Sequence, residues 1–531
     1  MRDDMSFGLT DEHKKIIHRI FSKHSKIDTA LIFGSRARNT FEVGSDVDIV
    51  LKGNITLSII SSVKSDLEET TLPYFFDILD YAAIKEPKLI EHIDKYGKVF
   101  YVRDWAEMRL GDICDVKGGK RLPKGETLIK EKTKHPYIRI RDIVGGKIAE
   151  DLLFISDNVF EEISKYIVNE EDIIISNVGT IGRVAQIPKR LNNANLTENC
   201  VKLVNVSEDI SRDFIYYFLS SGNGQSEIFS NTVGAVQPKL PIYGIGNIRM
   251  RIPPLPEQKA IAEVLSSFDD KIELLRKQNK TLEAIAEALF KHWFVDFEFP
   301  NADSKPYKSS DGKMIGSELG EIPEGWRVGI LEDIIDNIVD NRGKTPPLSE
   351  TGHMLLEGFN IFCEEVFPVF NYNGKQKMVR SNTYDLWFRS GHPEHLDILC
   401  ATVGTLPKWC LCPKEVKFGI AQNVISLRAN KDIISPYYLR DFFNSAYFKK
   451  AFNGRLITSV QPSIKVPHLL DIEIVIPEVK IVMKYHEKVC GFYEKIEKNY
   501  FQIQTLTRLR DTLLPKLMRG EVRVKKEIYN G

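Results

Sequence analysis

The sequence contains an internal duplication, which restricts the folds available to this chain more than any other feature. Two pairs of segments align without gaps at an offset of 224 residues, the distance from Lys271 to Lys495: residues 271–290 with 495–514, and residues 236–254 with 460–478. A single core cannot serve a chain of 531 residues. The duplication therefore predicts two homologous halves, roughly 103–300 and 323–525.

Each half has two parts of different sequence character. About 150 residues mix short β-rich runs with Gly, Asn and Pro, which is typical of an α+β globule, and about 40 residues of helical pattern follow. The expected fold class is thus α+β and multidomain. The expected boundaries are 1–102 for a separate α/β domain, 103–252 for the first globule, 253–300 for the first long helix, 301–322 for a linker rich in Pro, Ser and Gly, 323–476 for the second globule, 477–525 for the second helix and 526–531 for a tail.

The two long helices carry a heptad pattern of apolar residues. In the first helix the two seam positions begin at Ile261 and Leu265, and the pattern recurs 224 residues later. A sustained heptad predicts a coiled coil. Each seam contains one Asn, Asn279 and Asn499, at opposite kinds of seam position, which face each other only in an antiparallel pair. We therefore expect an antiparallel coiled coil whose register is fixed by a hydrogen bond between these two residues.

Two similar globules joined by an antiparallel helix pair have approximate two-fold symmetry. Duplex DNA has the same symmetry, and proteins use it to read two half-sites at a fixed spacing. Because the two globules differ in sequence, the half-sites should differ too. The duplication thus predicts recognition of a split, asymmetric site in double-stranded DNA.

The segment "IPPLPEQKAIAEVLSSFDDKIELLRKQNKTLEAIAEALFKHWFVDFEF", with "IPEGWRVGILEDI" and "LLPKLMRGEVRV", resembles the DNA-specificity (S) subunits of type I restriction-modification systems. The resemblance covers roughly residues 103–525. It implies two target-recognition domains, and helices that dock two copies of a DNA adenine methyltransferase subunit and, through them, a motor/nuclease subunit. It implies no cofactor for this region, which also lacks an adenine methylation motif. Since the repeat supplies both halves of the symmetry, we expect a single copy per complex.

Side chains suited to DNA contact lie in three kinds of segment. "YIRIRDIVGGK" has two Arg at alternate positions, hence on one face of an expected strand, "VGTIGR" has one after a glycine turn, and "VQPKL" and its repeat "VQPSIK" supply Gln and Lys. Arg and Gln make bidentate contacts with base edges, whereas Lys mostly contacts phosphate. For each residue an ordinary solvated side chain is the alternative. The candidates are Arg139, Arg141, Arg183, Gln237, Lys239, Gln461 and Lys465.

The stretch "LIFGSRARNTFEVGSDVDIVL" indicates a different chemistry. Asp46 and Asp48 stand at alternate positions of an expected strand, so both project to one face, where two carboxylates can bind Mg²⁺ bridged by triphosphate oxygens. A third carboxylate, Asp77, comes from "YFFDILDYAAI", with Asp80 as the less favoured choice. These residues predict a catalytic, metal-binding site for nucleotide transfer.

The turn before these carboxylates is suited to phosphate. Gly34 and Ser35 offer close backbone approach and a hydroxyl, and Arg36 or Arg38 could balance phosphate charge. This stretch resembles the minimal nucleotidyltransferases of the DNA polymerase β superfamily, with Asn39 in place of the last Gly of their motif. Asn tolerates a left-handed backbone. The resemblance covers about residues 10–102 and implies Mg²⁺ and a nucleoside triphosphate. Since such domains often act as antitoxins, it adds a toxin to the candidate partners.

Two functions are compatible with these observations. In the first, the chain is a DNA-recognition and assembly subunit whose amino-terminal domain is accessory, either an active transferase or a fold kept for docking. In the second, it is an antitoxin-like nucleotidyltransferase that modifies a protein partner and uses the DNA-binding region for targeting. The length of the duplicated region favours the first.

Composition restricts the location of the chain more than its function. Lys and Arg together number 73, as do Asp and Glu, so any DNA-binding face must be local. The amino terminus shows no apolar leader, and no apolar run approaches the roughly 18 residues of a membrane span. We therefore expect a cytoplasmic protein without a membrane partner.

Overall fold

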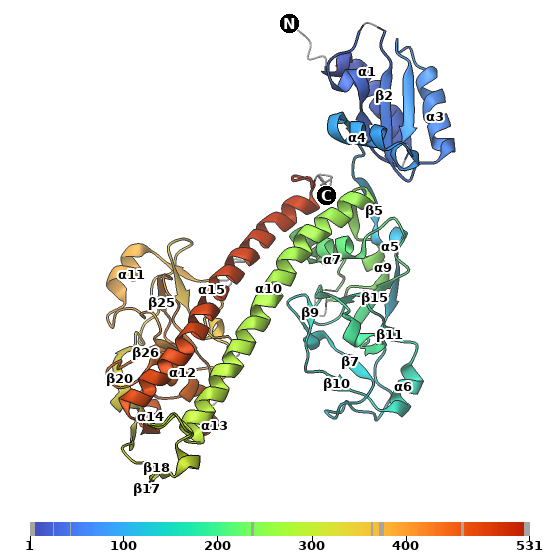
Figure 1. Cartoon of the computed structure of the whole chain (residues 1–531). Coiled ribbons are helices and arrows are strands. Elements are labelled where there is room, and N and C mark those ends of the chain that lie inside the picture. The colour runs from blue at the N-terminus through green and yellow to red at the C-terminus, as the bar shows by residue number, and fades with distance from the viewer. Residues whose placement is uncertain are drawn as a thin grey trace. The chain divides into compact units, whose positions relative to one another are not determined.

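The computed structural model describes residues 6–24, 26–42, 44–234, 238–362, 365–370, 376–457 and 461–524. The chain divides into two compact units, Met1–Ser267 with Arg510–Gly531, and Phe268–Leu509. Figure 1 shows the elements by label. The first unit contains the amino-terminal domain and the first globule, and the second unit contains the second globule. The two long helices contribute residues to both units.

The amino-terminal domain has one four-stranded sheet in the order β3-β2-β1-β4. Strand β2 pairs with β1 in antiparallel and with β3 in parallel orientation, and β4 is antiparallel to β1. The elements are α1 (Asp11–Lys23), β1 (Ile27–Ile32), α2 (Gly34–Ala37), β2 (Val47–Gly53), α3 (Leu57–Glu68), β3 (Phe76–Asp80), α4 (Pro87–Tyr96) and β4 (Lys98–Val102).

Apolar spacing and capping account for this domain. Helix α1 begins after Thr10, whose hydroxyl accepts a hydrogen bond from the His13 backbone N–H. Its buried face includes Phe21, which packs in one cluster with alternate β2 residues such as Ile49 and Leu51. The domain thus has a core of its own, built from residues that precede the first globule.

The first globule contains two four-stranded sheets, β13-β12-β15-β6 and β10-β7-β14-β11, and the pair β16-β5. Its strands are β5 (Ala106–Arg109), β6 (Asp115–Gly118), β7 (Pro136–Ile138), β8 (Ile143–Val144), β9 (Lys147–Ile148), β10 (Leu153–Phe154), β11 (Ile167–Val168), β12 (Ile173–Ser176), β13 (Val184–Gln186), β14 (Ala194–Leu196), β15 (Cys200–Val204) and β16 (Arg249–Ile252). Its helices are α5 (Leu110–Ile113), α6 (Asp157–Ile163), α7 (Arg212–Ser220), α8 (Gly222–Ser230) and α9 (Ile242–Gly246).

The second globule repeats the main sheet and the two-stranded pair of the first, while its other sheet, β22-β21-β25, has three strands where the first globule has four. Its main sheet has the order β20-β26-β23-β24, the same sequence of partners as in the first globule, and β19-β27 corresponds to β5-β16. Its strands are β19 (Arg327–Ile330), β20 (Ile335–Val339), β21 (His353–Leu356), β22 (Met378–Val379), β23 (Ile398–Ala401), β24 (Trp409–Leu411), β25 (Phe418–Ile420), β26 (Val424–Ala429) and β27 (Glu473–Ile476). Its helices are α11 (Ser381–Trp387), α12 (Pro436–Asn444), α13 (Ala446–Gly454) and α14 (Val466–Leu470).

The segment expected to be a linker, 301–322, is ordered. It contains most of the hairpin formed by β17 (Met314–Ser317) and β18 (Gly320–Pro323), whose turn uses Gly320 at a φ of +100°. Phe299 stacks on Tyr307, with ring centroids 4.5 Å apart. The Gly and Ser of the expected linker therefore include strand residues, since Gly316 and Ser317 lie in β17 and Gly320 begins β18.

Helices α10 (Leu255–Phe290) and α15 (Val479–Met518) pair in antiparallel orientation within the second unit (Figure 1). Asn499 Nδ2 donates a 2.8 Å hydrogen bond to Asn279 Oδ1, and the Tyr485 hydroxyl oxygen lies 3.2 Å from the Ala286 carbonyl oxygen. Residues later in α10 therefore contact residues earlier in α15, as in an antiparallel pair. The contact expected between the two seam Asn residues is thus present, and both side chains are buried. Neither these helices nor any other in the described ranges is long and apolar enough to cross a membrane.

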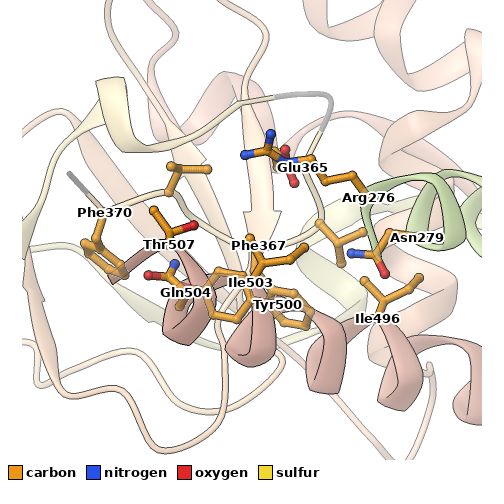
Figure 2. A pocket seen from close by; sticks show the side chains of 12 residues that line it. Arg276, Asn279, Glu365, Phe367, Phe370, Ile496, Tyr500, Ile503, Gln504 and Thr507 are labelled. Atoms are coloured by element: carbon orange, nitrogen blue, oxygen red, sulfur yellow. The ribbon is translucent and has the colours of Figure 1, made fainter. Parts of the chain in front are cut away.

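A cavity of about 110 Å³ adjoins this polar layer in the second unit (Figure 2). Figure 2 shows Asn279 of α10 and Tyr500 of α15 at its wall, with Phe367 and Phe370 from the globule. The ring centroids of Phe367 and Tyr500 are 5.2 Å apart. The globule therefore contacts the helix pair through aromatic side chains at the level of the Asn pair.

A buried polar network joins α12 to the helix pair in the same unit. Both Tyr485 and Tyr493 donate hydroxyl hydrogen bonds to Asp441, and Arg440 pairs with Glu283 at 2.6 Å. Burial raises the pKa of Asp441, while Arg440 lowers it. Each of these charged groups has a partner, and the contacts join α12 to both long helices.

Candidate active site and nucleic-acid interface

The amino-terminal carboxylates gather at one end of strands β2 and β3. Asp48 and Asp77 are directly paired residues of the two parallel strands, and Asp46 lies just before β2. Burial raises the pKa of Asp48, and the charges of Asp77 and Asp46 raise it further, whereas Arg36 and His92 lower it. The fold therefore brings the three predicted carboxylates close enough for the charges of Asp46 and Asp77 to act on Asp48.

Glycine is required at position 34, the first residue of α2, by the backbone conformation and by the neighbouring Asp48 side chain. Its φ is +70°, and a Cβ atom there would lie 2.2 Å from the Asp48 carboxylate oxygen Oδ2. Only glycine lets the backbone of the turn approach this side chain. Ser35 follows in the first turn of α2 and is partly exposed. Asn39, which replaces the expected Gly, has a φ of +56°, so its left-handed backbone explains why Asn is accepted.

The structure gives Arg36 a different role from the predicted phosphate contact. Its side chain is 2% exposed, and its guanidinium donates hydrogen bonds to the backbone carbonyls of Phe7, Ser45 and Asp46. It also lies over the Tyr74 ring at 4.9 Å. Its donors are thus used to hold the loop that carries Asp46. Residue type alone could not distinguish this positioning role from a phosphate contact.

Arg38 is exposed and lies near helix α4. Its Cζ is 5.9 Å from the centroid of the Tyr96 ring. His92 and Lys95 of the same helix also approach this ring. Sequence reasoning did not single out these α4 residues, although the basic and aromatic segment "HIDKYGK" was the available signal.

The donor set of the site suits Mg²⁺ in chemistry, since Asp46, Asp48 and Asp77 supply hard carboxylate oxygens. Within the described ranges, however, no three His, Cys, Asp or Glu side chains lie close enough to hold one metal ion together. Asp77 instead forms a 3.8 Å ion pair with Lys64 of α3. Of the three carboxylates, Asp77 is thus the one that faces a lysine in this structure.

Two predicted DNA-contacting residues are used inside the first globule. Arg139 Nε and Nη2 donate hydrogen bonds to the two carboxylate oxygens of Asp142, at 2.8 and 2.7 Å. Arg183 donates to the Ile140 and Ile143 carbonyls, at 3.1 and 2.9 Å. The expected strand face is also wrong, because Ile140–Asp142 forms a 3₁₀ turn rather than a strand. Both Arg residues therefore hold this turn in place. The sequence pattern did not show that Asp142 would be the partner of Arg139.

The turn leaves Arg141 exposed. Lys239, Gln461 and Lys465 are exposed as well. Gln237 lies outside the described residues.

The segments that carry these residues adopt the same pairing in both halves. Val178 of the first "VGT" turn forms a β-bridge with Lys239, which also bridges Val233. In the second half, Val403 bridges Ser463, which also bridges Ile457. A glycine turn and the segment after the "VQP" motif thus lie side by side at corresponding positions of the two globules. The exposed candidates Lys239 and Lys465 belong to these matched loops.

Comparisons with known proteins find matches for both the amino-terminal domain and the region that follows it. Residues 102–284 match the model of the type I restriction modification DNA specificity domain, and residues 14–106 match the polymerase β nucleotidyltransferase model. The chain is 26% identical over 441 residues to the type I restriction enzyme MjaIX specificity subunit of Methanocaldococcus jannaschii, which covers 80% of this chain and 95% of that protein. It is 23% identical over 486 residues to the HindI specificity subunit of Haemophilus influenzae, covering 79% of this chain and 100% of the relative.

A solved S subunit of a type I system from M. genitalium aligns with 78% of this chain and 96% of its own, at 16% identity and a TM-score of 0.43. The two family matches together extend from residue 14 to residue 284, and the curated relatives continue into the second half. The chain therefore carries a type I restriction-modification DNA specificity domain, preceded by a nucleotidyltransferase domain of the polymerase β type.

Proposed function

We propose that this chain is the sequence-specific DNA-recognition subunit of a type I restriction-modification complex and reads a split, asymmetric site. The observation that carries the proposal is the repeated topology. The first globule has the strand order β13-β12-β15-β6 and the second has β24-β23-β26-β20, with the same neighbours throughout. Two related but non-identical globules present related but non-identical surfaces, so each half-site would have its own sequence.

The matched loops are the part of each globule we assign to DNA. Lys239 and Lys465 are exposed in corresponding segments, and Arg141 is exposed on the turn that Arg139 and Arg183 hold. Lys suits phosphate contacts, while Arg can read a base edge. The internally bonded Arg residues would act indirectly, by positioning Arg141.

In this proposal the helix pair also scaffolds the other subunits, two copies of an adenine methyltransferase subunit and, through them, a motor/nuclease subunit. Leu274 and Ile285 of α10 are 49% and 46% exposed. They are eleven residues apart, which is close to three helical turns, so they share one face. Exposed apolar residues on one face of a helix favour a protein contact.

The test is methylome sequencing of cells that express the chain together with the methyltransferase subunit of its own locus. We expect a split methyladenine motif that requires residues 103–531 and persists in the Asp46→Ala/Asp48→Ala variant. Absence of any new motif despite a soluble complex would overturn the recognition role. Arg141→Ala should weaken methylation and relax one half of the motif, with Arg121→Ala as an exposed control on the same globule.

We further propose that the amino-terminal domain transfers a nucleotidyl group to a hydroxyl of a protein partner, with Mg²⁺ and a nucleoside triphosphate. An acceptor oxygen would attack the α-phosphorus, the bond to the bridging oxygen would break, and pyrophosphate would leave with the electron pair while the hydroxyl proton passes to solvent. Bound Mg²⁺ would offset charge on the phosphates. Support comes from the paired Asp48 and Asp77 and from the glycine turn against Asp48.

Transfer of label from α-³²P nucleoside triphosphates to proteins of the host extract tests this second activity. We expect labelling by the full chain that is lost in Asp48→Asn, a near-isosteric change that removes the charge. Equal labelling by both proteins would refute the transferase. A labelled toxin-like partner, together with the absence of a methylation motif, would favour the antitoxin-like alternative.

A further inference from the structure

The cavity beside the Asn pair has walls from three elements of the second unit (Figure 2). Its lining residues lie on α10, on α15 and in the segment 365–370 of the globule. Ile496, Tyr500 and Ile503 recur every three or four residues, so they belong to one face of α15. A ligand in this cavity would therefore contact the globule and both long helices together.

Hydrogen bonds hold the walls of the cavity in place. The Tyr500 hydroxyl donates to the Pro368 carbonyl at 3.0 Å, which ties α15 to the globule. The buried Asn360 donates from Nδ2 to the Val369 carbonyl at 2.9 Å, and its own carbonyl accepts from the Val369 N–H at 2.8 Å. Sites for small molecules are largely formed before the ligand arrives. These contacts give the cavity that property.

The volume of the cavity limits a ligand to a single ring. At about 110 Å³, it is somewhat smaller than an apolar cavity of about 150 Å³ that binds benzene, and far below the roughly 300 Å³ of the smallest sites for drug-sized molecules. Three aromatic side chains line it, Phe367, Phe370 and Tyr500. Aromatic walls favour a flat ring that packs against them. A nucleoside is too large for this space.

Polar groups of opposite character meet at the wall formed by α10 and the globule. The hydrogen bond from Asn499 uses Oδ1 of Asn279 and not its amide nitrogen, which can donate to a ligand. Arg276, one turn earlier on α10, offers guanidinium donors, and Glu365 offers a carboxylate acceptor. Figure 2 shows Arg276 and Glu365 on the same side of the cavity. A matching ligand must therefore carry an acceptor and a donor together.

We propose that this cavity binds a single-ring aromatic amide. The ring packs against Phe367 and Tyr500, the carbonyl oxygen accepts from Asn279 Nδ2, and the amide N–H donates to Glu365. A neutral amide is favoured over an aromatic acid or amine, because Arg276 and Glu365 present opposite charges at the same end. Since the ligand contacts three elements, its binding holds the second globule on the helix pair.

Benzamide is the probe, and benzoate and benzamidine are charged analogues of the same ring. We expect ligand-observed NMR of the full chain to show saturation transfer to benzamide, and the midpoint of thermal unfolding to rise with its concentration. Benzoate places a second anion beside Glu365, and benzamidine a second cation beside Arg276. Each loses a hydrogen bond to a charged group, so titrations should show at least about 10-fold weaker binding.

Filling the cavity tests its location. Ile503→Trp places a large ring in the space and should abolish benzamide binding. Leu509→Trp is the matched control, the same new side chain on the same helix at a position that is 45% exposed and outside the lining residues. It should bind benzamide as the wild type does.

Two results overturn the proposal: no benzamide binding by the wild type, or binding that Ile503→Trp leaves unchanged. Equal affinity for the three compounds overturns the amide as the ligand class. If Ile503→Trp does not fold, Glu365→Gln decides, because it keeps the shape and an acceptor oxygen but removes the charge. It should shift the affinity ratio toward benzoate by about 10-fold, and an unchanged ratio contradicts the assigned contacts.

Discussion

At the scale of single residues, Gly34 couples backbone geometry to the candidate chemistry. A Cβ here would clash with Asp48, and a φ of +70° strains any L side chain. We predict that Gly34→Ala lowers nucleotidyl transfer by about 10-fold or more, because Asp48 must move. The measurement is labelling by purified full-length chain.

Gly44→Ala provides the matched control for this prediction. Gly44 has a φ of +98°, but a Cβ there meets nothing within 4 Å. Both changes add backbone strain, and only Gly34→Ala adds the clash. Equal losses of transfer in the two variants would show that strain, and not displacement of Asp48, limits the activity.

At the scale of the elements, the Asn pair is a buried hydrogen-bonded layer between α10 and α15. Asn499 Nδ2 donates to Asn279 Oδ1, while Asn499 Oδ1 has no hydrogen-bond partner within the described ranges. We predict that Asn279→Leu destabilises the chain by about 1–3 kcal/mol, because it leaves a buried amide unpaired. Thermal unfolding measures this loss, and Asn279→Leu/Asn499→Leu should recover most of it.

The double variant also tests whether the pair sets the register. An apolar layer tolerates sliding that a hydrogen-bonded layer opposes. We therefore expect spin labels on exposed positions of α10 and α15 to give one narrow distance in the wild type and a broader distribution in the double variant. A distribution as narrow as that of the wild type would mean that the surrounding apolar contacts, such as those of Tyr485, already fix the register.

At the scale of the whole molecule, the amino-terminal domain and the first globule have separate cores. The core of the domain runs from Leu9 to Tyr101, and the main core of the globule begins at Trp105 and includes Leu517 and Met518 of α15. We predict that a chain starting after residue 102 directs methylation to the same split motif as the full chain. Methylome sequencing of cells carrying either form measures this.

A changed or missing motif in the truncated chain would contradict this independence. The full-length Asp46→Ala/Asp48→Ala variant separates two causes. If that variant also changes the motif, the candidate active site itself influences recognition. If it does not, recognition of the motif requires the amino-terminal domain but not its carboxylates.

The sequence anticipated most of what depends on local periodicity and on repetition. The heptads and the opposed Asn residues predicted the antiparallel contact between Asn279 and Asn499, because seam positions follow from spacing alone. The left-handed position of Asn39 could also be expected, since few residue types adopt it. The strand orders of the globules could not be predicted in this way, because local sequence patterns contain little information on which strands, far apart in the sequence, pair with each other.

By itself, the sequence determined the duplicated architecture, the helix pair and the identity of the carboxylates at the end of β2. Only the tertiary structure decided how charged side chains are used. Arg36, Arg139 and Arg183 are chemically suited to phosphate or bases, yet each donates to groups within its own domain. Lys95, in contrast, lies against the Tyr96 ring, a contact that its sequence segment did not predict. The physical reason is that a charge acts on what surrounds it in space, and residues far apart in the chain supply those surroundings.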